Sequence, residues 1–203
     1  MRLLRTAETA LSMQVTIFVG LLLVSMGAVC KDTQSYYVPL QAESCRVPSE
    51  PVRHRYVSRD LGAVECRVWA KVQSAPSGLY VVSSNEHSWI DFVLSDKVWS
   101  SEDEVVYEKE NQFGNFPNVS NAPAEIRTDR AGVAIGLIFR VTAQASDYHS
   151  LNPGASNVSR LFVLGFRKQG VCFLGLARDN IAARKLLDSG AICRRLLKAE
   201  RLR

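Results

Sequence analysis

Histidine is the side chain best suited to proton transfer near neutral pH, and this chain has three. His54 and His149 stand apart, whereas His87 lies among acids and hydroxyls. The neighbours that could complete a nucleophile–histidine–acid set with His87 are Ser83, Ser84, Ser88, Glu86 and Asp91. Such a set requires the imidazole to contact the nucleophile and an acid to orient its other nitrogen. Adjacency in sequence does not establish those contacts, so the set is a hypothesis about the fold.

Other signatures of catalysis or cofactor binding are missing. The sequence has no G-x-S-x-G motif. The glycines of 132–136 (GVAIG) lack the spacing of a phosphate-binding loop and precede or join a predicted strand. Glu102, Asp103 and Glu104 lack the pattern of a calcium-binding loop and indicate a solvated loop. The sequence therefore favours a protein without catalytic residues, cofactor or metal, and leaves a hydrolase using His87 as the alternative.

Cysteine spacing points to disulfides. Apart from Cys30, the chain has Cys45, Cys66, Cys172 and Cys193, which form two pairs, each separated by 21 positions. An even number of cysteines behind a secretory signal suggests disulfides formed in an oxidising compartment. Local pairing within each pair is preferred among the three connectivities, and buried free thiols are the alternative. Without a C-x-x-C pair, a zinc site is not expected.

The N-terminus has the composition of a secretory signal peptide over residues 1–30. Arg2 and Arg5 precede an apolar run, Val15–Val24, and small residues follow it. A membrane helix needs about 20 apolar residues, and Leu11–Cys30 nearly reaches that length. An uncleaved membrane anchor is therefore the alternative.

The positive charge is concentrated at the C-terminus. The net charge is +5, of which residues 194–203 carry +4 and residues 31–193 none. A nucleic-acid-binding domain would present a basic face on its folded surface, so no nucleic-acid partner is expected. The basic tail also contains leucines and could contact a membrane or a partner. A solvated, frayed terminus is the simpler interpretation.

Two further groups of residues could contribute to a surface. Asn118 and Asn157 begin N-x-S motifs in predicted loops, where glycosylation would be sterically possible. Trp69 and Trp89 fall on the more polar faces of predicted strands, and Trp99 follows. They indicate either an exposed partner surface or a face covered by a second layer.

The elements that must position these residues are mainly strands. Alternating or continuous apolar residues predict strands over Val64–Gln73, Leu79–Val82, Trp89–Ser95, Ile135–Gln144, Leu161–Phe166 and Val171–Leu176, with short ones over Val52–Val57 and Val105–Tyr107. The apolar runs at 161–166 and 171–176 suit strands covered on both faces. Lys168–Gly170 suits a three-residue hairpin loop.

Helices are expected only at the C-terminal end. Asp179 is a plausible N-cap for a helix to Asp188, which Ser189 and Gly190 would end. A second short helix is expected from Ala191 into the tail. About seven strands followed by one or two helices predict a single α+β domain, residues 31–203, built on a mainly antiparallel sheet. A β-sandwich with a helical appendage is the alternative.

Together these patterns predict an exported protein, periplasmic or secreted. We expect a disulfide-supported binding or cell-envelope domain whose partner is another protein or envelope component. The alternatives are the hydrolase and a membrane-tethered component that contacts the membrane through its N-terminal segment or basic tail.

Overall fold

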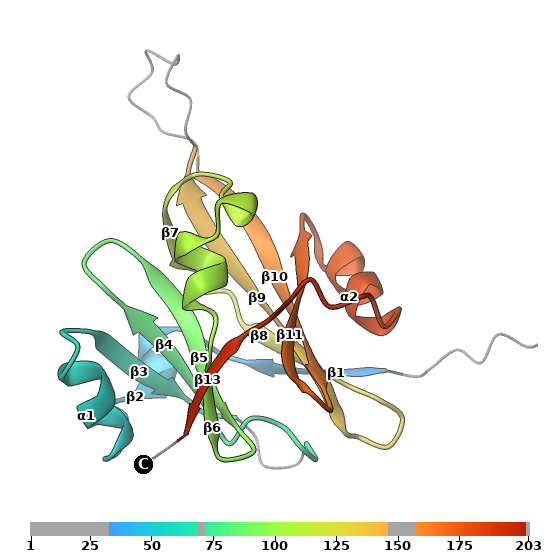
Figure 1. Cartoon of the computed structure of the whole chain (residues 1–203), viewed down its shortest axis with the longest axis horizontal. Coiled ribbons are helices and arrows are strands. Elements are labelled where there is room, and N and C mark those ends of the chain that lie inside the picture. Colours follow the sequence, from blue (N-terminus) through green and yellow to red (C-terminus); the bar gives the residue numbers. More distant parts are fainter. Residues whose placement is uncertain (1–32, 69–71, 146–156, 202–203) are drawn as a thin grey trace, which may run out of the picture. The chain divides into compact units, whose positions relative to one another are not determined.

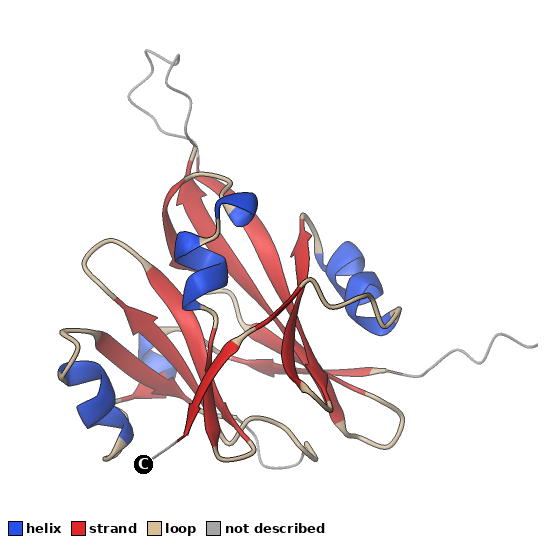
Figure 2. Cartoon of the chain, viewed as in Figure 1, coloured by secondary structure: helices blue, strands red, loops and turns tan. Residues whose placement is uncertain are grey.

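A computed structural model describes residues 33–68, 72–145 and 157–201. The described residues form thirteen strands in two sheets, and every pairing between named strands is antiparallel (Figure 1). Strands dominate and helices are few (Figure 2). The predicted mainly antiparallel α+β fold is confirmed, and the strands outnumber the seven or so expected.

The first sheet has seven strands. Six lie in the order β1-β8-β9-β10-β11-β12. The seventh, β7, pairs with residues 141–144 of β9, whereas β8 pairs with residues 134–138. Their bounds are β1 Gln34–Val38, β7 Asn115–Val119, β8 Ala124–Thr128, β9 Ala134–Gln144, β10 Asn157–Arg167, β11 Gly170–Ala177 and β12 Arg195–Leu196.

The second sheet has six strands in the order β13-β6-β5-β4-β3-β2. Their bounds are β2 Cys45–Arg46, β3 Gly62–Cys66, β4 Gly78–Ser83, β5 Ser88–Leu94, β6 Lys97–Ser100 and β13 Lys198–Arg201. The described helical elements are η1 Ala42–Ser44, α1 Val52–Val57, η2 Asp103–Tyr107, η3 Lys109–Asn111 and α2 Asn180–Asp188.

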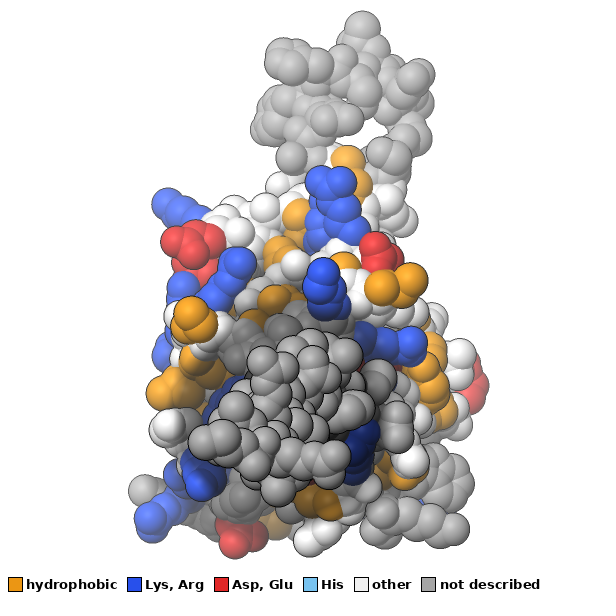
Figure 3. All heavy atoms as spheres, turned by 90° about the vertical axis from the view of Figure 1, so that its right-hand side faces the viewer, with side chains coloured by type: hydrophobic (Ala, Val, Ile, Leu, Met, Phe, Trp, Pro, Cys, Tyr) orange, Lys and Arg blue, Asp and Glu red, His pale blue; other side chains and the backbone are white. Residues whose placement is uncertain are grey.

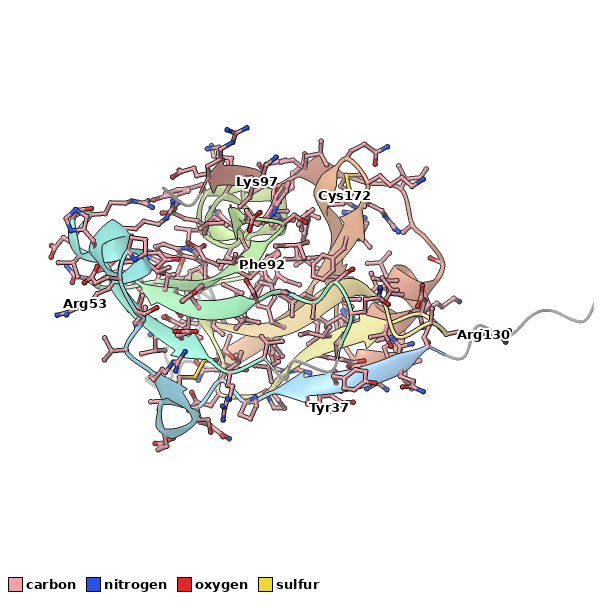
Figure 4. The ribbon with its side chains drawn as sticks, turned by 90° about the horizontal axis from the view of Figure 1, so that it is seen from below. Tyr37, Arg53, Phe92, Lys97, Arg130 and Cys172 are labelled. Carbon is pink, nitrogen blue, oxygen red and sulfur yellow. A yellow bond between two sulfur atoms is a disulfide. The ribbon has the colours of Figure 1, made fainter. Side chains whose placement is uncertain are left out.

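One apolar core lies between the two sheets. Phe92 of β5 and Phe166 of β10 meet there with ring centroids 5.8 Å apart, and Phe92 lies in the interior in Figure 4. Phe162 and Leu164 of β10 belong to the same core. Burial of such apolar side chains is the main stabilising contribution to a fold of this kind.

The opposite face of β10 and β11 is covered by α2. Leu161 and Val163 of β10 pack with Ala183 and Leu187 of α2 in a second apolar cluster. Both faces of β10 are therefore buried, which explains why its sequence is continuously apolar. The Asp179 carboxylate accepts a hydrogen bond from the Ala182 amide, as expected of an N-cap.

The prediction of an edge strand over Val52–Val57 is wrong, because this segment is helix α1. Val52 and Tyr56 are four residues apart and both buried, so they form one helical face. Tyr56 packs on Tyr80 of β4, with ring centroids 6.2 Å apart. The strand predicted over Val64–Gln73 is shorter than expected and ends at Cys66 as β3.

The basic tail forms strands, so both the second helix and the frayed terminus are wrong. Its first strand, β12, pairs with β11, and its second, β13, pairs with β6 of the other sheet. Leu197, between the two, is buried, and its amide donates to the Val171 carbonyl at 2.9 Å. The tail thus crosses from one sheet to the other.

Candidate functional site

A small neutral cavity lies beside His87. Its volume is about 130 Å³, and nine of its ten lining residues fall between Val105 and Pro117, in the connection from β6 to β7 and in the first residues of β7. His87 is the tenth. This connection contains η2, a π-helix, and η3, a 3-10 helix. π-Helices are rare and occur frequently at functional sites.

A buried acid anchors this connection. Glu104 is 1% exposed. The Asn111 amide nitrogen donates to Oε2 of Glu104 at 2.9 Å and to its backbone oxygen at 3.1 Å. Burial raises the pKa of Glu104, while the charge of Arg195 lowers it. Arg195 also forms an ion pair with Glu108, so the tail and this connection hold each other in place.

These contacts correct two predictions. The acidic run at 102–104 is not a solvated loop throughout, because Glu104 is turned inward and hydrogen-bonded. Val105–Tyr107 is helical rather than a strand. A buried polar group must find partners, and Asn111 and Arg195 provide them from positions that the local sequence does not indicate.

Strand β7 places an aromatic ring next to the cavity. Phe116 has a φ of +50° and is 43% exposed, and its ring centroid lies 6.1 Å from that of His87. The pairing of β7 with β9 shifts register between Asn115 and Asn118. The Asn118 amide nitrogen donates to the Phe116 carbonyl at 2.9 Å and to the Glu86 carbonyl at 3.1 Å. Asn118 therefore fixes Phe116 against the turn that carries His87.

The hydroxyls around His87 are engaged in structural bonds. The Ser88 hydroxyl donates to Asn118 Oδ1 at 3.1 Å and accepts from the Val119 amide at 2.8 Å. The Ser84 hydroxyl accepts from the His87 backbone amide at 3.3 Å. Ser83 lies at the end of β4, paired with Ser88. The Ser88 bonds join β5 to β7, and the Ser84 bond lies within the β4–β5 turn.

The acid of the predicted set is held elsewhere. Asp91 is 1% exposed, and its Oδ2 accepts a hydrogen bond from the Tyr56 hydroxyl of α1 at 3.0 Å. Glu86 is exposed. Across the described ranges, no hydrogen bond joins the His87 ring to any of the proposed acids or hydroxyls. The described geometry does not assemble the nucleophile–histidine–acid set.

The remaining predicted positions fall in different places. His54 is exposed on α1, while His149 and Trp69 lie outside the described residues. Trp89 and Trp99 are buried, so of the two interpretations the covered face holds for both and the exposed partner surface does not. A second layer covers them: both belong to the core that also contains Tyr56 of α1.

The asparagines of both glycosylation motifs, and Gly136 of the 132–136 segment, lie in strands. Asn118 lies in β7 and Asn157 begins β10, so neither is in a loop as predicted. Gly136 lies in β9, where an added Cβ would be 2.3 Å from the Leu164 carbonyl oxygen. That glycine is required by close packing of β9 on β10. Within the described part of the chain, no group of three or more His, Cys, Asp or Glu could hold a metal ion.

A second polar cluster is fully paired and fastens α2 to the first sheet. The Arg127 guanidinium is buried and bonds to Asp188, Ser35 and Thr33. Arg184 donates to both carboxylate oxygens of Glu125, at 2.8 and 3.0 Å. Since each charge has a partner, this network stabilises the position of α2 and offers no free group to a ligand.

The structure contains both expected disulfides. Cys45–Cys66 joins the paired strands β2 and β3 with a Cα–Cα distance of 4.3 Å. Cys172–Cys193 joins β11 to the segment after α2 with a Cα–Cα distance of 5.5 Å, and it lies beside the Cys172 label in Figure 4. No helix among the described residues is long and apolar enough to cross a membrane.

The cavity was missed at the sequence level because its lining comes from a charged run and a segment rich in turn formers. The available signal was the pair of aromatics, Phe113 and Phe116, within that polar segment. The described surface seen in Figure 3 carries Lys and Arg side chains interspersed with acidic and apolar ones. Comparison with family models, curated proteins and solved structures found no match to this chain.

Proposed function

We propose that this protein is an exported, non-enzymatic binding domain, and that the cavity beside His87 is its binding site. The observation that carries the proposal is the neutral cavity flanked by the exposed ring of Phe116. An exposed aromatic ring next to a preformed cavity is a typical anchor point for a ligand or partner. The partner is another protein or a component of the cell envelope.

The polar groups near the cavity support binding rather than catalysis. Ser88 and Asn118 bond to each other, and Asp91 faces α1. A general base must be within hydrogen-bond reach of the group that it activates. The hydrolase hypothesis therefore gains no support from the described residues.

The disulfides support export. Two disulfides in a chain of 203 residues fit an oxidising, extracytoplasmic environment. We propose that residues 1–30 are a signal peptide that directs the chain there. Retention of that segment as an anchor would tether the same binding domain to a membrane.

Site-specific photocrosslinking in the native cells tests this function. A photoreactive phenylalanine analogue is placed at Phe116, and in a matched control at Val57, which is 61% exposed on α1. We expect a discrete adduct from position 116 and none from position 57. Equal labelling at both positions, or no adduct at position 116, would refute the proposed site.

A further inference from the structure

Resting on this proposed function, we propose that the group recognised by the cavity is a single neutral sugar unit, either free or part of a glycan or polysaccharide. The sugar would stack against Phe116 and hydrogen-bond to the side-chain amides of Gln112 and Asn115. Three properties of the described residues lead to this class of ligand: the charge of the lining, its free hydrogen-bonding groups and the fixed aromatic ring.

The lining contains no Asp, Glu, Lys or Arg side chain. The buried acid Glu104 is bonded to Asn111, which lines the cavity, and its charge is opposed by Arg195. A charged ligand loses hydration on entering a cavity and needs an opposite charge to compensate. The lining does not provide one, so it favours a neutral ligand.

The hydrogen-bonding groups of the lining are amides. Gln112 and Asn115 are exposed, and no hydrogen bond engages their side chains within the described part of the chain. A carboxamide has a donor nitrogen and an acceptor oxygen side by side. Neighbouring hydroxyls of a sugar ring, each both donor and acceptor, complement that arrangement.

The conformation of Phe116 is unusual for a residue that only connects two strands. A bulky side chain at positive φ is an outlier that persists only when the surroundings enforce it. Here the Asn118 amide holds the Phe116 carbonyl, and the ring rests against His87. The exposed ring provides a flat apolar surface for the C–H face of a sugar, while the sugar hydroxyls point toward the amides.

The size of the cavity limits the ligand. At roughly 30 Å³ for each water molecule in the liquid, a volume of about 130 Å³ corresponds to some four waters. That room suits part of one sugar ring, with the remainder extending into solvent. An extended oligosaccharide would contact the surface but would not be enclosed.

Solution NMR of the full, disulfide-bonded protein tests the inference. The probes are glucose, galactose, mannose and N-acetylglucosamine, each titrated to millimolar concentration. We expect at least one to shift the amide signals of residues 111–117 and His87 selectively. Phe116→Ala and Gln112→Ala should each weaken that binding by about tenfold. The control Val57→Ala should leave it unchanged.

Two outcomes would overturn the inference. One is the absence of selective shifts with all four sugars, and the other is a sugar response that survives Phe116→Ala and Gln112→Ala. The crosslinking experiment separates failure of the inference from failure of the proposed function. A specific adduct at position 116 that excess sugar does not reduce leaves a binding site for another class of partner. Loss of both the adduct and the shifts removes both proposals.

Discussion

Asp91 illustrates how a single residue changes meaning between sequence and structure. In the sequence, Asp91 lies on the more polar face of the predicted strand, with Trp89 and Val93. Its closeness to His87 along the chain suggests it as the acid of a catalytic set. In the structure Asp91 is buried, and its carboxylate accepts a hydrogen bond from the Tyr56 hydroxyl of α1. Its other oxygen, Oδ1, is buried and has no hydrogen-bond partner among the described residues. The nearby Ser100 hydroxyl lowers the pKa of Asp91, but burial has the larger effect. Burial raises the pKa of Asp91 to about 6.

The pKa of Asp91 predicts a pH dependence of stability. Its unfolded-state pKa is about 3.9, so the folded protein holds the proton more tightly. The contribution of Asp91 to stability is therefore full below about pH 4 and is lost as the pH rises through about 6. Two pKa units correspond to roughly 3 kcal/mol.

Asp91→Asn keeps the shape of the protonated acid and removes the titration. At pH 7 we expect the variant to be more stable than the parent by up to roughly 3 kcal/mol, and about equal to it at pH 4. Guanidinium unfolding at both pH values, with the disulfides intact, measures the difference. A variant that is less stable than the parent at pH 7 would show that the ionised carboxylate stabilises the fold.

Local sequence predicts individual residues only where their partners are local. The cysteine pairs could be anticipated from their equal spacing, and Asp179 from its position before a helix. The surroundings of Phe116 could not, because its conformation depends on Asn118 and on the turn carrying His87. Likewise Glu104 is buried through Asn111 and Arg195, and Arg195 lies 91 positions further along the chain.

Helices and strands, too, can be predicted from the sequence only where local residues determine them. Helix α2 is predictable, since it has a cap, an apolar face and a glycine after its end. The strands of the core are predictable from alternation and continuous apolar runs. Strand β13 is not, because all four of its residues are exposed and backbone pairing with β6 places it. Tertiary pairing of this kind leaves no periodicity in the sequence.

The Cys172–Cys193 disulfide is expected to hold the tail in position. Both disulfides span 21 positions, so the chain-entropy model assigns each about 3 kcal/mol. Removing either with paired Cys→Ala substitutions should lower the free energy of unfolding by a similar amount. Only loss of Cys172–Cys193 should also speed amide exchange in residues 195–201, because that bond lies next to β12. Exchange that is equally fast in both double variants would contradict this role.

On the scale of the whole domain, the chain passes between the two sheets three times, and two of these crossings join edge strands. It leaves β1 for β2 through η1, and it leaves β12 for β13 at Leu197. Each disulfide lies near one of these edge crossings: Cys45 lies in β2, and Cys172 of β11 pairs with Leu196 of β12. The oxidised state therefore fastens the chain near the two crossings between edge strands, which is consistent with the oxidising compartment proposed for the protein.

Intact-mass analysis of the protein recovered from its native cells, alkylated without prior reduction, tests the central claim of an exported, disulfide-stabilised domain most directly. We predict a mass that lacks about the first 30 residues and carries no alkyl group on Cys45, Cys66, Cys172 or Cys193. Reduction before alkylation should then add four alkyl groups. A full-length chain with all four cysteines alkylated in the absence of reductant would contradict the account.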